Sequence, residues 1–177
     1  MNKRTPAHLV LKSAVLFLSL LCFYPLSATN PQKKEMKELN VKKVSLANVA
    51  VENVPALLDK EKVDFQSINT VNWKAFPYQP EVQFRIAHTD GAILIHYKVK
   101  EASVRAVATG DNGAVWEDAC VEFFSIPAGD GIYYNVECNC VGTLLIGAGG
   151  GRSNREHAPQ EVMDKVQRCL LYTSDAA

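Results

Sequence analysis

The chain has 177 residues, of which 19 are lysine or arginine and 19 are aspartate or glutamate, so its formal net charge at pH 7 is zero. This balance excludes the basic surface that a nucleic-acid-binding protein or a polybasic membrane anchor needs.

The first 28 residues have the layout of a secretory signal peptide. Lys3 and Arg4 form a positive start, residues 14–24 are a short apolar run, and Ala28 ends a small-residue cleavage site. The apolar run is too short and wrongly flanked for a membrane-spanning helix. We therefore expect export to the periplasm, the cell surface or the medium, and no transmembrane segment.

Two further segments lie outside the expected domain. Residues 29–53 begin with TNPQKKEMKELN, and we interpret them as a flexible lead-in that could end in an edge strand and a turn, with Pro55 stopping the pattern. Residues 169–177, CLLYTSDAA, resemble the in-frame translation of a sequencing-library transposase adapter, so we interpret them as a foreign tail. The domain proper is then residues 54–168, enough for one hydrophobic core but hardly for two.

From residue 63 onward the chain shows the period-two alternation of β-strands. A turn at Asp90-Gly91 joins the first two strand segments, and this pair readily takes up the positive φ of a tight hairpin. The five expected segments are EVQFRIAH (81–88), AILIHYKVKE (92–101), DACVEFFSI (118–126), IYYNVECNCVG (132–142) and TLLIGAG (143–149). Short strands separated by Gly, Pro and Asp indicate an all-β fold, an antiparallel β-sandwich.

The segment 132–142 divides its side chains into two chemically different sets. One set is apolar and reads as a core face: Tyr134, Val136, Cys138 and Cys140. The other is a row of hydrogen-bonding groups with an aromatic ring at its end: Tyr133, Asn135, Glu137 and Asn139. If segment 118–126 pairs with this strand, Glu122 joins the row. An ordinary solvent face is the plain interpretation, but Asn and Glu beside aromatic rings favour a binding surface.

Three cysteines, Cys120, Cys138 and Cys140, belong to the domain. An odd number leaves at least one unpaired within the chain. We favour buried free thiols, because free cysteine packs as a small hydrophobe. A bridge from Cys120 to one of the other two stays open, whereas a zinc site lacks the further ligands it needs.

The polar and aromatic residues of the domain suit a sugar. Sugars present apolar C–H faces and hydroxyls that both donate and accept, so a site needs an aromatic platform and rigid amides, carboxylates or guanidiniums. The candidates are Trp73, Arg105, Trp116, Glu117, Tyr133, Asn135, Glu137 and Asn139. We expect Trp73 on a loop and Trp116 at the opening of a strand. The oxygen-rich stretch TGDNGAVWED leaves calcium open, although it lacks the spacing of a known calcium loop.

Two other function classes remain as alternatives. Glycoside hydrolysis requires two carboxyl groups flanking the scissile bond, and Glu117, Glu122 and Glu137 are the acids available. A haem-binding redox sandwich would need an axial ligand, for which His96 and Met163 are poorly placed. The histidines show no metal-ligand or triad spacing, and the glycine-rich GAGGGRSNRE lacks the Lys-Ser/Thr of a phosphate loop.

Three stretches resemble the family 9 carbohydrate-binding modules of exported Bacteroidetes proteins, over about residues 54–155. They are INTVNWKAFPYQPEVQFRIAH (68–88), VWEDACVEFF (115–124) and DGIYYNVECNCVGTLL (130–145). The resemblance implies a jelly-roll or immunoglobulin-like β-sandwich that binds glucan or xylan chains without hydrolysing them. It also implies association with xylanases and other glycoside hydrolases, no catalytic cofactor, and optional structural calcium.

The resemblance assigns roles to individual residues. Trp73 becomes one of two stacking walls, and Arg105, Glu117, Asn135, Glu137 and Asn139 become partners of the sugar hydroxyls. The family's second stacking tryptophan comes later than this chain reaches, so we expect a sandwich incomplete at its C-terminus. The resulting prediction is a non-catalytic, exported domain that binds a polysaccharide or oligosaccharide and is attached to or encoded beside a glycoside hydrolase.

Overall fold

The structure, a computed structural model, describes residues 38–45 and 50–171. The strands and helices given below all belong to the unit Leu39–Ala177. The expected signal peptide lies outside the described residues. Among the residues described, no helix has the length and apolar character needed to cross a membrane.

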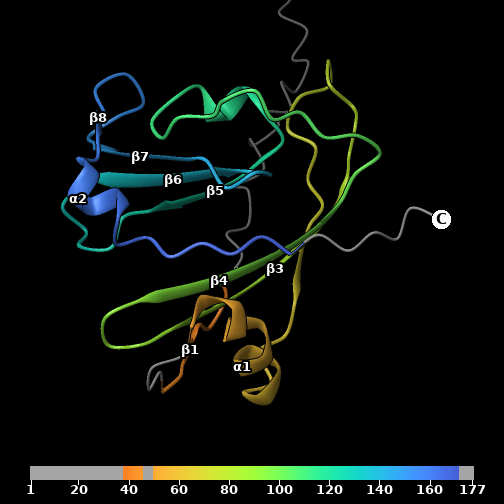
Figure 1. Cartoon of the computed structure of the whole chain (residues 1–177), viewed down its shortest axis with the longest axis vertical. Helices are drawn as coiled ribbons and strands as arrows, with labels where there is room; N and C mark the ends of the chain where they lie inside the picture. The colour runs from red at the N-terminus through yellow and green to blue at the C-terminus, as the bar shows by residue number, and fades with distance from the viewer. Residues whose placement is uncertain (1–37, 46–49, 172–177) are drawn as a thin grey trace, which may run out of the picture. The chain divides into compact units, whose positions relative to one another are not determined.

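One four-stranded sheet is built around strand β3 (Glu81–His88). Strand β4 (Ile93–Lys100) pairs with β3 along its whole length, in antiparallel register from Glu81↔Lys100 to His88↔Ile93. On the other edge of β3, strand β2 (Gln66–Ile68) pairs antiparallel and strand β1 (Lys42–Lys43) pairs parallel. Both long strands of this hairpin were expected from the alternation of the sequence, and the structure confirms them (Figure 1).

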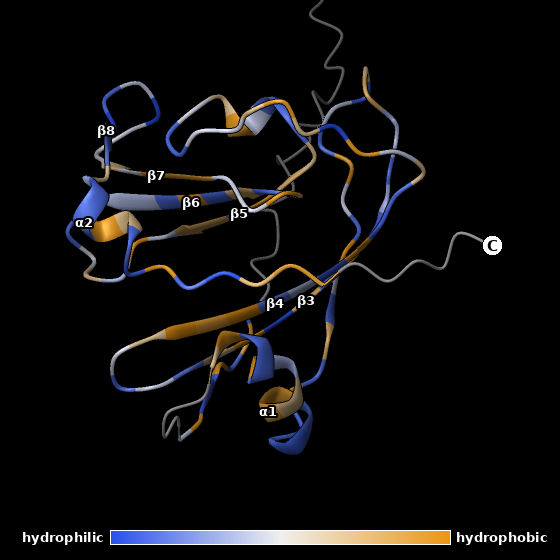
Figure 2. Ribbon diagram, viewed as in Figure 1, coloured by the Kyte–Doolittle hydropathy of each residue, from blue (hydrophilic) through white to orange (hydrophobic). Residues whose placement is uncertain are grey.

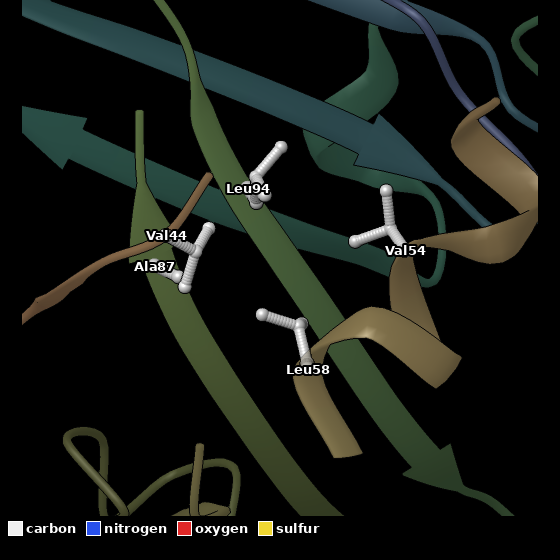
Figure 3. Close-up of a cluster of buried hydrophobic side chains, with 5 residues drawn as sticks. All are labelled: Val44, Val54, Leu58, Ala87 and Leu94. Atoms are coloured by element: carbon white, nitrogen blue, oxygen red, sulfur yellow. The ribbon is translucent and has the colours of Figure 1, made fainter. Parts of the chain in front are cut away.

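A short helix covers one face of this sheet. The 3₁₀-helix η1 (Val51–Asn53) leads into helix α1 (Val54–Lys60), which carries Pro55 in its first turn. There the missing N–H of proline is harmless, because first-turn N–H groups have no partner within the helix. The helix packs against β3, β4 and the residue after β1 through five buried side chains: Val44, Val54, Leu58, Ala87 and Leu94 (Figure 3).

The ordered domain starts earlier than residue 54, the start expected from the sequence, because Val44 belongs to this cluster. Val44 is only 4% exposed, and its backbone N–H donates to the carbonyl of His88 at 2.8 Å. The ordered fold therefore begins before residue 54, within the stretch interpreted as a flexible lead-in. The edge strand considered for that stretch is present, but Pro55 starts a helix rather than ending a strand.

A second four-stranded sheet is antiparallel throughout, in the order β5-β6-β7-β8. Its strands are β5 (Cys120–Ser125), β6 (Tyr133–Asn139), β7 (Leu144–Gly149) and β8 (Glu156–His157). Leu144, Ile146 and Met163 form a buried cluster on one face, where helix α2 (Gln160–Met163) supplies the methionine. Figure 2 shows the hydrophobic character of β7 that makes this core.

The two sheets form an all-β sandwich, as the sequence predicted. A hydrogen bond links them directly, because the hydroxyl of Tyr97 on β4 donates to the carbonyl of Glu122 on β5 at 3.2 Å. Burial is the main cause that raises the pKa of Tyr97 to about 12. Cys120, Cys138 and Cys140 are free thiols, as expected, although they are half-buried rather than fully enclosed.

Candidate functional site

The polar row of β6 has the predicted alternation but not the predicted exposure. Val136 and Cys138 pack against the Leu144–Ile146–Met163 cluster, so the opposite face carries Asn135, Glu137 and Asn139. These three residues are 0%, 4% and 1% exposed. The expectation of a row open to a ligand is therefore wrong for all three, because loops that the alternation cannot reveal cover this face.

The side-chain amide of Asn139 has hydrogen-bond partners within the protein on both its nitrogen and its oxygen. Its Nδ2 donates to the carbonyl of Ala108 and to Oδ2 of Asp118, both at 3.0 Å. Its Oδ1 accepts from the backbone N–H of Thr143 at 2.8 Å and of Val141 at 3.2 Å. An amide has two donors and one acceptor oxygen with two lone pairs, so little capacity remains for a sugar hydroxyl. Asn139 ties the turn after β6 to the long connection between β4 and β5.

Asp118 is the counterpart of Asn139 on that connection. Its side chain is 1% exposed, and its two oxygens accept from the backbone N–H groups of Val107 and Ala108, each at 2.9 Å. The pKa of Asp118 is lowered, chiefly by the N–H of Val107, with further contributions from Asn139, Ala108 and Arg105 that outweigh desolvation. The carboxylate thus stays charged and holds the loop in one conformation.

Arg105, Trp116 and Glu117 lie on the same connection, on its outer side. The 3₁₀-helix η2 (Val115–Glu117) buries Val115 completely and leaves Trp116 55% exposed. Trp116 therefore stands on a 3₁₀ turn before β5, not at the opening of a strand as expected. The side chain of Arg105 is 58% exposed, with Nε 3.6 Å from Oδ1 of Asp118. The same Nε donates to the carbonyl of Glu117 at 3.0 Å.

A depression of about 390 Å³ lies beside these residues. Small-molecule sites in proteins start near this size. The depression is lined by Arg105, Glu117 and Asp118 together with residues 107–114. A second depression, of about 500 Å³, is lined among others by Thr109, Asp111, Thr143 and Arg168. Only the first contains residues predicted from the sequence to bind sugar.

Trp73 lies on a loop, as predicted, and is 68% exposed. The carbonyl of Trp73 accepts from the N–H of Phe76 at 3.0 Å, which folds this part of the chain into a tight turn. The hydroxyl of Tyr78 accepts from the N–H of Ala102 at 3.2 Å, so the loop lies against the start of the connection that leads to Arg105. Sequence reasoning missed Phe76 and Tyr78, 75% and 60% exposed, although two more aromatic rings beside Trp73 were a visible signal.

Tyr133 belongs to a different part of the surface. It lies six positions from Asn139 on the same strand, which corresponds to roughly 20 Å of extended chain. Its ring lies 6.2 Å from that of Phe124 and 5.6 Å from the guanidinium carbon of Arg155. The structure therefore groups Arg105, Trp116 and Glu117 with the supporting Asp118 and Asn139, and leaves Tyr133 apart.

Asn135 and Glu137 form a buried pair near Tyr133. Nδ2 of Asn135 donates to Oε1 of Glu137 at 2.8 Å, and Nη1 of Arg155 lies 3.9 Å from the same oxygen. Burial, followed by repulsion from Glu122, raises the pKa of Glu137, whereas Asn135, Arg155 and Arg152 act in the opposite direction. Gly147 makes room for this pair, since a Cβ at that position would lie 2.7 Å from Oδ1 of Asn135.

The acids of the oxygen-rich stretch are committed to partners within the protein. Within residues 38–45 and 50–171, no three side chains of His, Cys, Asp or Glu are grouped so as to hold a metal ion. In the oxygen-rich stretch, Asp111 accepts from the N–H of Leu144 and pairs with Arg168. Asp118 is committed to backbone N–H groups, as described above. We therefore assign no metal to this loop.

The residues considered for haem are also committed elsewhere. Nδ1 of His96 accepts from Nε of Arg85 at 3.2 Å, and the imidazole packs edge-on to Phe65 at 5.3 Å. Met163 is 2% exposed in the core beside β7. Both side chains therefore take part in interactions within the fold.

Comparison with known proteins assigns this chain to a family. The family model of carbohydrate-binding family 9 matches residues 52–177. A crystal structure of a candidate carbohydrate-binding protein from Bacteroides uniformis ATCC 8492 is 60% identical in sequence, with a TM-score of 0.67. The match covers 71% of this chain and 58% of that one, so this chain spans little more than half the length of that relative. No curated protein matches. The chain belongs to carbohydrate-binding family 9.

Proposed function

We propose that this protein binds the chains of a plant-type glycan, such as xylan or glucan, at the surface that carries Arg105, Trp116 and Glu117, with Trp73 contributing from the loop that contacts the same connection at Ala102. Membership of a carbohydrate-binding family supports binding without catalysis. The surface combines the two kinds of group that a sugar needs, exposed aromatic rings for C–H faces and charged groups for hydroxyl pairs.

The observation that carries the proposal is the arrangement of Arg105 at the 390 Å³ depression. Its Nε is held by Glu117 and Asp118, while the side chain is 58% exposed. A guanidinium has five N–H donors in a rigid fork, so four remain for a ligand. A planar fork that donates two parallel hydrogen bonds suits two neighbouring hydroxyl oxygens of one sugar ring.

The two tryptophans would supply the apolar part of the site. Trp73 and Trp116 are 68% and 55% exposed, which is unusual for the largest hydrophobic side chain. A sugar ring stacked on either indole removes apolar area from water on both partners. Glu117 is exposed beside Trp116 and adds an acceptor for a hydroxyl proton.

The finer parts of the proposal concern cellular context. A signal peptide at residues 1–28 would deliver the protein to the periplasm, the cell surface or the medium, where polysaccharides are degraded. The 60% identical relative comes from Bacteroides uniformis, which fits such a role. An attached or separately encoded glycoside hydrolase would be the catalytic partner.

The position of Glu137 does not support the hydrolase alternative. Glu137 is 4% exposed beneath Arg155 and bonded to Asn135, so it cannot reach a glycosidic bond without unfolding this face. Glu122 lies opposite Glu137 on β5, and Glu117 lies on η2. Hydrolysis needs an acid and a second carboxyl group, both reaching the scissile bond.

Affinity electrophoresis in gels containing xylan, β-glucan or mannan tests the proposal. We expect retardation in at least one of the first two gels, and loss of retardation for the Arg105→Ala variant. Arg152→Ala is the matched control, since it removes an exposed arginine whose side chain belongs to neither depression. Unchanged mobility of the wild-type protein in every gel would contradict the proposal.

A further inference from the structure

We propose that Asp118 is a positioning residue for carbohydrate binding, which orients the guanidinium of Arg105 toward the ligand without touching the ligand itself. The inference rests on the function proposed above. The buried carboxylate of Asp118 directly follows the exposed residues Trp116 and Glu117 in the sequence.

Asp118 is held in place by three hydrogen bonds in a buried position. Its oxygens accept from the N–H groups of Val107 and Ala108 and from the amide of Asn139, all between 2.9 and 3.0 Å. The amide of Asn139 is in turn held by the N–H groups of Thr143 and Val141. Because its side chain is 1% exposed, water does not compete for these bonds.

Both the main chain and the side chain of Arg105 are held by this network. Its backbone carbonyl accepts from the N–H of Ala119 at 2.9 Å. Its Nε donates to the carbonyl of Glu117 and lies 3.6 Å from Oδ1 of Asp118. The three consecutive residues 117–119 therefore hold both the main chain and the side chain of Arg105.

This attachment leaves the terminal nitrogens of Arg105 free within the described part of the chain, where only Nε has a hydrogen-bond acceptor. An exposed arginine normally samples many rotamers, and fixing it on binding costs conformational entropy. Asp118 reduces this cost because its charge, together with the carbonyl of Glu117, restricts the guanidinium before the sugar arrives. Preorganisation of this kind increases affinity without adding a contact to the ligand.

A double-mutant cycle on the full chain tests the inference, with calorimetric titration of cellohexaose and xylohexaose. We expect Asp118→Asn to weaken binding about tenfold when Arg105 is present and to have little effect in the Arg105→Ala background, as coupled residues do. Asp59→Asn is the matched control, because Asp59 pairs with Arg85 in the other sheet. It should leave the affinity unchanged.

A spectroscopic measurement on the wild-type protein covers the case in which Asp118→Asn does not fold. In a ¹H–¹⁵N spectrum, the Nε–H of Arg105 should give a resolved signal that exchanges slowly with water. A signal as rapidly exchanging as that of exposed Arg152 would overturn the inference.

The outcomes separate this inference from the function beneath it. If the wild-type protein binds neither oligosaccharide, the proposed function fails. If it binds both equally well with and without the Asp118→Asn change, or if that change costs the same factor in the Arg105→Ala background, only the positioning role of Asp118 fails.

Discussion

The Nδ2 atom of Asn139 lies 3.0 Å from Oδ2 of Asp118, which joins the end of β6 to the connection between β4 and β5. Both side chains are almost completely buried, at 1% exposure each. On the outer side of the same connection stand Arg105, Trp116 and Glu117, the residues of the proposed sugar site. The buried amide and carboxylate thus support the surface on which these three residues stand.

Replacing Asn139 should destabilise the fold strongly. Asn139→Ala leaves the N–H groups of Thr143 and Val141 without their acceptor and removes one of the three donors to the carboxylate of Asp118. Each buried group left unsatisfied costs about 1–3 kcal/mol, so we expect a loss of about 3 kcal/mol in the free energy of unfolding. Urea denaturation measures it. Asn154→Ala, at an exposed position, is the control and should change stability by less than about 0.5 kcal/mol.

Trp73 and Trp116 should report ligand binding directly. They are the only two tryptophans in the chain and are both exposed, so a bound sugar should shift the emission to shorter wavelength. Trp73→Ala and Trp116→Ala should each weaken binding about tenfold, because stacking adds roughly 1 kcal/mol beyond the area buried. Neither change should lower stability by more than about 0.5 kcal/mol. Titration of each variant with xylohexaose, monitored by fluorescence, checks this, and an unchanged Kd would remove that residue from the site.

Glu137 should titrate above the usual pKa of a glutamate. Burial and the neighbouring Glu122 raise its pKa above the reference value of 4.5, while Arg155 holds it down. Arg155→Met should therefore raise the pKa of Glu137 further. Carbon-detected NMR of the side-chain carboxyl during a pH titration measures both values. A pKa at or below 4.5 in the wild-type protein would show that Glu137 is better solvated than its position indicates.

Acid should weaken the fold through three aspartates. The pKa values of Asp59, Asp111 and Asp118 are lowered, chiefly by hydrogen bonds from Arg85, Arg168 and the N–H of Val107 respectively. A carboxyl group with a lowered folded-state pKa stabilises the fold fully above its unfolded value, near 3.8, and this contribution disappears as the pH falls through the lower folded value.

The urea concentration at which half of the protein is unfolded should therefore decrease as the pH is lowered below about 4. The urea midpoint of Asp118→Asn should be lower than that of the wild-type protein at neutral pH. It should also change less on acidification, since one of the three titrating groups is gone. A midpoint that depends on pH identically in both proteins would contradict the assignment of a lowered pKa to Asp118.

The strands of this fold could be predicted because their signals are local. Alternation and the Asp90-Gly91 turn located the hairpin of β3 and β4, and alternation in residues 118–142 located β5 and β6. The structure shows that β5 and β6 pair, with Glu122 opposite Glu137. The separation of Val136 and Cys138 from Asn135 and Glu137 onto two faces was also correct. In each case the side chains of a residue and of its neighbours two positions away are enough to show which face of the strand they share.

The positions that could not be predicted depend on distant segments. Alternation identifies the face of Asn139 but not the loop that covers it, because the partners Ala108 and Asp118 lie 31 and 21 positions away. In the same way, Val44 is buried only because α1 packs over β3. Pro55 was ambiguous for a local reason, since proline both ends strands and starts helices. The roles of Trp73 and Arg105 came from resemblance to the family and stay predictions, whereas their exposure on loops is a structural observation.

The most direct test of the account is a calorimetric titration of the wild-type chain and of Arg105→Ala with xylohexaose and cellohexaose at neutral pH. We expect measurable heat and a saturable isotherm for at least one oligosaccharide with the wild-type protein, and at least about tenfold weaker binding in Arg105→Ala, because a hydrogen bond from a charged group contributes roughly 1.5–3 kcal/mol. Equal affinities in the two proteins, or no heat with either sugar, would contradict a carbohydrate site built around Arg105.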